Sequence, residues 1–108
     1  MASDLGLFEL LVLMAAAAHG DQAYGVVIRR DVAASRGTDV SSGAVYTTLE
    51  RLERRGLLSS RQGDPSEVRG GRPRRYYRLT RAGRAAIDTN YSAVARLAVR
   101  LKPGMSRS

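Results

Sequence analysis

The sequence predicts an α+β, mainly α, fold with three helices, a two-stranded hairpin and one long C-terminal helix. Three observations lead to this prediction. Apolar residues recur at helical spacing in four stretches. Two short strand-like runs flank a segment rich in turn-forming residues. The last helical stretch carries a heptad pattern of apolar residues. With 108 residues, the chain is long enough for one domain.

The first two helices are expected from about Leu5 to Ala18 and from about Gln22 to Ser35. Four apolar residues at spacings of three and four form the stripe of the first helix: Leu7, Leu10, Leu11 and Met14. Asp21 is expected to cap the second helix, and Gly37 to end it.

The third helix is expected at about 41–55, where Ser41 or Ser42 can cap it and Gly56 follows its end. Three residues predict its buried stripe: Val45, Leu49 and Leu52. The opposite face should be exposed, with small residues first and basic residues last: Ala44, Thr47, Thr48, Arg51 and Arg55. Such a helix can approach base edges, and its N-terminal amides favour a phosphate. The alternative is a plain surface helix.

Two strands are expected at 57–62 and 74–79. In the second strand, alternation predicts Tyr77 and Leu79 facing inward and Tyr76 and Arg78 facing outward. The intervening loop is too long for a tight hairpin, so we interpret the pair of strands as a wing. Four arginines would project from this wing and suit a narrow minor groove: Arg69, Arg72, Arg74 and Arg75.

The last helix is expected to begin after Thr80, as N-cap, and to run to about Lys102, before Pro103 and Gly104. Its apolar residues alternate at spacings of four and three: Ile87, Tyr91, Val94, Ala98 and Leu101. This is a coiled-coil seam over two heptads. It predicts a subunit interface, the alternative being packing within the chain.

Basic residues are concentrated in the second half of the chain. Fifteen of the 18 Lys and Arg residues lie in 51–108, against four acidic residues, and the whole chain has a formal charge of +8. Eleven arginines fall between Arg51 and Arg84. Concentrated basic charge favours a polyanion as partner, because each neutralised phosphate releases condensed counterions. A solvated basic face is the alternative.

Most catalytic classes are excluded by composition. The chain has no cysteine and one histidine, His19, which leaves no thiol nucleophile, metal cluster or catalytic triad. No metal, no cofactor and no enzymatic activity are therefore expected. The apolar run Leu10–Ala18 is too short to span a membrane and lacks the cationic start of a secretory signal, so a cytoplasmic protein without a membrane partner is expected.

Residues 41–58, SSGAVYTTLERLERRGLL, resemble the recognition-helix motif of the PadR family of bacterial transcriptional regulators. The family's wing strand and the entry to its C-terminal helix resemble residues 71–83, GRPRRYYRLTRAG. The start of its second helix resembles Ala23-Tyr24-Gly25 with Ile28. These pieces cover most of the chain in the family's order.

The resemblance implies a winged helix-turn-helix domain over 1–80, with the recognition helix at about 41–55 and the wing at about 57–79. A dimerisation helix over 80–103 and a tail over 104–108 would follow. It implies a homodimer, joined through the first and last helices, that binds double-stranded DNA at a pseudo-palindromic operator as a repressor. A winged-helix module that binds proteins without specific DNA binding is the alternative.

The residues expected at DNA are Ser41, Ser42, Gly43, Ala44, Tyr46, Thr47, Thr48, Arg51, Arg69, Arg72, Arg74 and Arg75. The residues expected in the dimer interface are Leu7, Phe8, Leu11, Ile87, Tyr91, Val94, Ala98 and Leu101. Ser42 and Thr47 stand where many members of the family carry proline, so the local backbone and the bases read can differ.

A small-molecule effector is a further expected partner that the resemblance leaves open. Drug-binding members of the subgroup with a single last helix hold flat cations between tryptophans. This chain has no tryptophan. Val94 takes that position, with Tyr91 one turn earlier, and the two form a weaker stacking site. We expect Tyr91 to pack in the seam rather than to bind a ligand.

Overall fold

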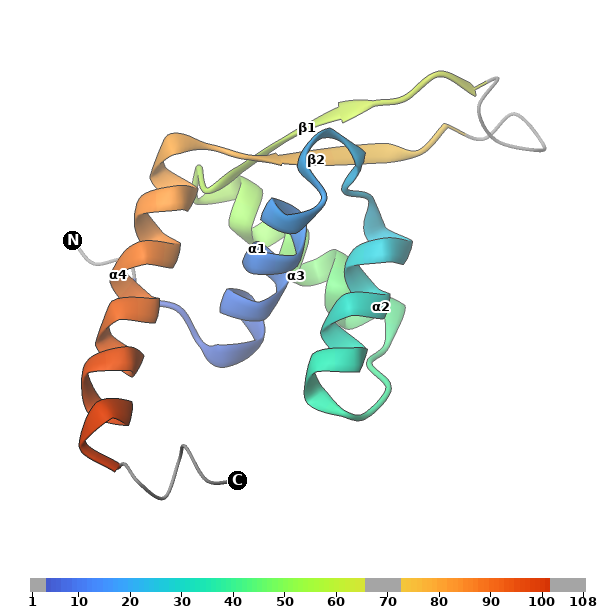
Figure 1. Cartoon of the computed structure of the whole chain (residues 1–108). Helices are drawn as coiled ribbons and strands as arrows, with labels where there is room; N and C mark the ends of the chain where they lie inside the picture. The colour runs from blue at the N-terminus through green and yellow to red at the C-terminus, as the bar shows by residue number, and fades with distance from the viewer. Residues whose placement is uncertain (1–3, 66–72, 102–108) are drawn as a thin grey trace.

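The computed structural model describes residues 4–65 and 73–101. Its elements are α1 (Leu7–Ala18), the 3-10 helix η1 (Gly20–Gln22), α2 (Gly25–Arg36), α3 (Ser42–Arg54), β1 (Leu58–Gln62), β2 (Arg75–Leu79), α4 (Arg81–Ala98) and the 3-10 turn η3 (Val99–Leu101). Figure 1 shows the β1–β2 hairpin running across one end of the helices, with α4 along one side of the body. The predicted order of elements is confirmed.

Local capping signals determine where three helices begin or end. Ser41 Oγ accepts a hydrogen bond from the Ala44 N–H at 3.0 Å and starts α3, as one of the two predicted caps. Thr80 Oγ1 accepts from the Gly83 N–H at 3.0 Å and starts α4. Gly37, with φ of 72°, takes the left-handed conformation that ends α2.

The start of α2 differs from the prediction. Asp21 does not cap this helix, because residues 20–22 form η1 and Tyr24 precedes α2. Ala23 and Tyr24 are extended instead and pair with β2: the Tyr77 N–H donates to the Ala23 carbonyl at 2.8 Å, and Tyr24 forms an antiparallel bridge with Tyr76. Because these two residues pair with the sheet, α2 begins at Gly25, later than predicted.

The hairpin is antiparallel, in a register from Leu58 opposite Leu79 to Gln62 opposite Arg75. The prediction that Tyr76 faces solvent is wrong, since this residue is 5% exposed, about as buried as Tyr77. The alternation of inward and outward residues assumes that one face of the sheet is exposed to solvent. Here Tyr24 and Arg61 cover the second face, with ring or guanidinium contacts to Tyr76.

The core joins α1, α2 and α3 to the base of the hairpin and the first turns of α4. Its fully buried side chains include Leu13, Ile28, Leu49, Leu52 and Leu58. Gly83 permits α4 to approach the strand, because a Cβ at this position would collide with the Leu57 carbonyl oxygen. The position of α4 therefore depends on a glycine in its first turn.

The second half of α4 extends past the body of the domain (Figure 1). Its large apolar side chains are exposed: Tyr91, Val94 and Leu97, followed by Val99 and Leu101 in η3. Among the described residues, no helix combines the length and the apolar character needed to cross a bilayer.

Candidate nucleic-acid interface

The N-terminus of α3 is open to solvent. Ser41, Ser42, Gly43 and Ala44 are all exposed, and the Ser41 cap occupies only one of the first amides. The remaining N–H groups and the positive end of the helix dipole favour an anion. This end of α3 can therefore meet a phosphate without rearrangement.

The outward face of α3 is rotated from the predicted one. Thr48 is 4% exposed and belongs to the buried stripe with Val45 and Leu49, so its predicted place on the exposed face is wrong. Periodicity could not detect this, because a threonine at the border of a stripe is polar yet small enough to bury. Opposite the buried stripe lie four exposed residues: Gly43, Thr47, Glu50 and Arg54.

Tyr46 joins α3 to the start of α2. Its side chain lies against Gly25, where an added Cβ would come within 2.6 Å of the tyrosine Cε1. Only glycine allows this contact, yet Tyr46 remains 46% exposed. Its ring is therefore held in place by α2 while solvent reaches its outer side.

A groove lies where the start of α2, Tyr46 of α3 and the base of the wing meet. It has a volume of about 540 Å³ and is lined by Tyr24, Gly25, Val26, Tyr46, Pro73, Arg74 and Arg75. Aromatic, apolar and cationic groups thus meet between the helix and the hairpin. This composition suits the sugar–phosphate backbone of a nucleic acid, which presents both apolar and anionic surface.

Stacked side chains hold the wing to α2. The Arg74 guanidinium lies 4.2 Å from the centre of the Tyr24 ring, and Tyr24 meets Tyr76 edge to face at 5.7 Å. Arg61 stacks on Tyr76 at 4.6 Å. Cation–π contacts of this kind contribute about 0.5–1 kcal/mol each at exposed sites. This set of contacts cannot be recognised in the sequence, because it joins residues from three elements.

Two of the four predicted wing arginines can be placed. Arg75 is exposed, and its Nη1 donates to Ser60 Oγ at 2.8 Å across the hairpin. Arg74 is half-buried by its stack on Tyr24. Arg69 and Arg72 lie outside the described residues. The described base of the wing therefore presents cationic groups on the side that borders α3.

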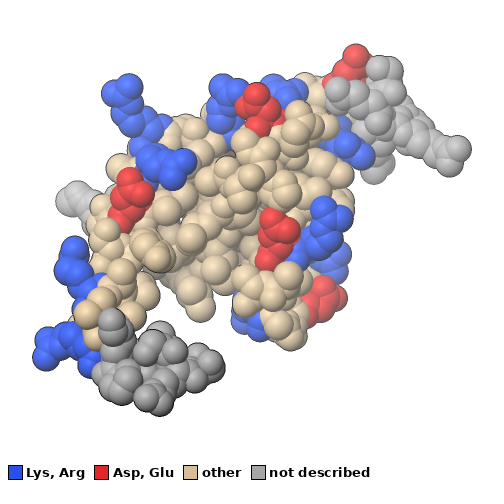
Figure 2. Space-filling view, viewed as in Figure 1, with Lys and Arg blue, Asp and Glu red and all other residues tan. Residues whose placement is uncertain are grey.

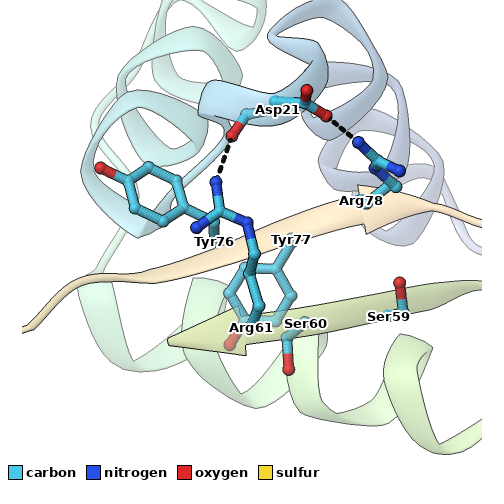
Figure 3. Close-up of a pocket in the computed structure, with 7 residues that line it drawn as sticks. All are labelled: Asp21, Ser59, Ser60, Arg61, Tyr76, Tyr77 and Arg78. Atoms are coloured by element: carbon cyan, nitrogen blue, oxygen red, sulfur yellow. Dashed lines mark hydrogen bonds and ion pairs between the residues drawn. The ribbon is translucent and has the colours of Figure 1, made fainter. Parts of the chain in front are cut away.

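The opposite face of the hairpin is held by η1 (Figure 3). Asp21 forms an ion pair with Arg78, and Arg61 Nη2 donates to the Asp21 carbonyl at 3.3 Å. The hydrogen bond and the charge of Arg78 lower the pKa of Asp21 below its usual value of 3.8. These contacts surround a hollow of about 260 Å³. Arg78 is exposed, which confirms the outward position predicted for it, and it is partnered within the chain.

The basic C-terminal part of α3 is paired with α1. Glu9 lies 3.7 Å from Arg51 and 3.6 Å from Arg55, measured between carboxylate oxygens and guanidinium nitrogens. Arg51, predicted at DNA, is thus turned toward α1. Arg54 was not among the predicted site residues, although it lies opposite the buried stripe; the correct helical phase would have found it.

Figure 2 shows cationic side chains along the hairpin edge and along α4, around an uncharged centre.

The predicted interface residues fall into three groups. Leu7, Tyr91, Val94 and Leu101 are exposed, each by more than half. Phe8, Leu11 and Ala98 are half-buried. Ile87 is 7% exposed and belongs to the core of its own chain, so the exposed part of the predicted stripe begins one turn later, at Tyr91. Their contact with a second copy stays a prediction.

The helices and hairpin define a winged helix-turn-helix fold. A structure of a PadR-like transcription factor from Bacteroides fragilis superposes with a TM-score of 0.71 at 25% identity, covering 89% of this chain and 87% of the other. A PadR family regulator from Clostridium difficile superposes at 0.70 with 20% identity, over 93% and 99% of the two chains. The second likeness shows the fold alone.

The family model described as the transcriptional regulator PadR-like family matches residues 12–89. The chain therefore belongs to the PadR-like family, whose members are transcriptional regulators rather than enzymes. It is 46% identical over 72 residues to the transcriptional regulator Rv3488 of Mycobacterium tuberculosis. That match covers 67% of this chain and 64% of the relative.

Within the described residues, no cluster of three His, Cys, Asp or Glu side chains could hold a metal ion.

Proposed function

We propose that this chain binds double-stranded DNA as a homodimer and acts as a transcriptional repressor at a pseudo-palindromic operator. The observation that carries the proposal is the exposed, capped N-terminus of α3 beside a groove lined by Tyr46, Arg74 and Arg75. Membership of a family of transcriptional regulators supports it. The repressor role rests on the family resemblance.

In this proposal α3 enters the major groove by its first turns. Ser41, Ser42 and Gly43 offer their amides to a phosphate, while Ala44 and Thr47 approach base edges. The Tyr46 hydroxyl donates a hydrogen bond to the DNA backbone. Arg74 and Arg75 contact the flanking phosphates or the minor groove, together with Arg69 and Arg72 of the wing loop. Arg54 joins this set as a phosphate contact, because it lies on the outward face.

The exposed apolar surface of α4 and α1 supports the homodimer. Tyr91, Val94 and Leu7 are each more than half exposed, which leaves a large apolar area without cover in one protomer. A second copy would bury it. Because Tyr91 and Val94 are needed in this contact, an effector at these two residues would act by changing how the two α4 helices cross, and so the distance between the recognition helices.

The test is fluorescence anisotropy with the purified full chain and duplex fragments from bacterial promoters, with random duplex as competitor. The proposal predicts a selected fragment bound at least about 1000-fold more tightly than random duplex at moderate salt. Equal affinity for all duplexes would reject a sequence-specific regulator. It would leave a protein-binding winged helix as the alternative.

A further inference from the structure

We propose that Glu9 limits the sequence-independent affinity of this chain for DNA, because it holds Arg51 of the recognition helix and Arg55 at the end of that helix on α1 and keeps their charge away from the DNA backbone. This inference rests on the proposed DNA-binding function. It assigns a role to an acidic residue outside the helix-turn-helix and predicts that Arg51 and Arg55 do not serve in DNA binding.

The geometry of the three side chains carries the inference. Arg51 of α3 and Arg55, which follows the last residue of this helix, are one turn apart, and the Glu9 carboxylate meets both, at 3.7 and 3.6 Å. The Glu9 side chain is 18% exposed, whereas those of Arg51 and Arg55 are 48% and 34% exposed. A half-buried carboxylate thus partners two cations that are themselves partly exposed to solvent.

Glu9 is itself fixed in position. Its Oε1 accepts a hydrogen bond from the Gly6 N–H at 3.0 Å, which closes the first turn of α1. The preceding segment is anchored on both sides, since Arg55 Nη2 donates to the Asp4 carbonyl at 3.4 Å and the Leu5 N–H donates to Asn90 Oδ1 of α4 at 3.2 Å. The carboxylate therefore cannot leave the arginines by a simple side-chain rotation without losing this cap.

The neighbouring Arg54 shows what the pairing changes. Arg54 lies on the same helix and carries the same charge, but it points away from α1 on the outward face. An arginine free to neutralise a phosphate binds every sequence alike. Holding two of the three arginines back therefore lowers the affinity of the chain for duplex DNA of any sequence.

The experiment measures the affinity of the full chain for random duplex across a salt series. Glu9→Gln is the informative variant, because glutamine still accepts the Gly6 N–H while the charge is lost. The inference predicts a steeper salt dependence, by about 0.9 in log–log slope for each released arginine that reaches a phosphate. Between roughly 50 and 200 mM salt this is about a threefold larger change in affinity per arginine. Asp88→Asn, an exposed residue of α4, is the control for the added charge.

The triple variant Glu9→Gln, Arg51→Ala, Arg55→Ala should return to the wild-type slope. Independently, Arg51→Ala with Arg55→Ala should leave the slope unchanged in the wild-type background, whereas Arg54→Ala should flatten it by about 0.9. This comparison stands even where Glu9→Gln prevents folding. A Glu9→Gln slope equal to that of Asp88→Asn, or a loss of slope in the Arg51 and Arg55 double variant, would overturn the inference. Failure of the wild-type chain to select any operator would instead reject the proposed function.

Discussion

The Tyr46 ring of the recognition helix lies directly against Gly25 at the start of α2, with no room for a side chain between them. This contact fixes the angle between the two helices of the helix-turn-helix. It also holds a tyrosine that is 46% exposed at the edge of the groove beside the wing. The packing of the fold and the proposed phosphate contact therefore share one residue pair.

Replacing Gly25 with alanine should displace Tyr46 and weaken operator binding by about tenfold or more. Overpacking of this kind also costs about 1–3 kcal/mol of folding free energy. Urea unfolding and anisotropy measured on the same variant separate the two effects. The double variant Gly25→Ala, Tyr46→Phe should not recover binding, whereas Gly25→Ala with the smaller Tyr46→Ser should recover stability but not affinity. Unchanged affinity in Gly25→Ala would contradict the proposed role of Tyr46.

Replacing Gly43 with alanine should lower operator affinity without lowering the stability of the fold. No heavy atom lies within 4 Å of the site of a Cβ at Gly43, so the protomer accepts the change. Alanine in a helix is favoured over glycine by about 1 kcal/mol at most, and thermal stability should stay equal or rise. Operator affinity should fall, because the added methyl group would stand between the helix and the groove floor. A variant that binds as tightly as the wild type would show that Gly43 does not approach DNA.

Replacing Arg75 with alanine should weaken binding to all duplexes and reduce the salt slope by about 0.9. The matched control is Arg78→Ala on the same strand, whose partner is Asp21 on the other face of the hairpin. This control should leave the slope unchanged. Equal slopes for the two variants would mean that the side of the wing bordering α3 has no special part in binding.

Asp21 should make stability depend on acid pH. Its pKa is lowered by the hydrogen bond and charge of Arg78, so the native state favours the ionised carboxylate. The stabilisation is present above the unfolded value of about 3.8 and is lost as the pH falls through the native pKa. Urea unfolding should therefore show wild type more stable than Asp21→Asn at neutral pH. This difference in the free energy of unfolding should disappear as the pH falls through the native pKa of Asp21. A gap that persists at low pH would exclude ionisation of Asp21 as its source.

Elements that depend on local chemistry could be predicted from the sequence. Ser41, Thr80 and Gly37 act at helix ends through bonds or dihedral angles within a few residues of the chain. The heptad pattern of α4 predicted a subunit interface, which stays a prediction; Tyr91, Val94 and Leu101 of this pattern are exposed in the protomer. Such features need no knowledge of the remaining fold.

Features that depend on another element could not be predicted. Tyr76 is buried because Tyr24, about fifty residues earlier, pairs with its strand. Arg51 is drawn to Glu9 on α1, and Ile87 is covered by the core of the same chain. In each case the local pattern was compatible with exposure. The contact that decides it comes from a distant part of the sequence.

The central claim is that two copies of this chain present their α3 helices to successive major grooves of one duplex. Adjacent half-sites must then be about 34–36 Å apart, one turn of DNA. The most direct measurement compares affinity for a selected operator with affinity for the same operator carrying five extra base pairs between its half-sites. The account predicts a loss to near the level of random duplex, because the second half-site turns to the opposite side of the helix. Equal affinity for the two duplexes would contradict it.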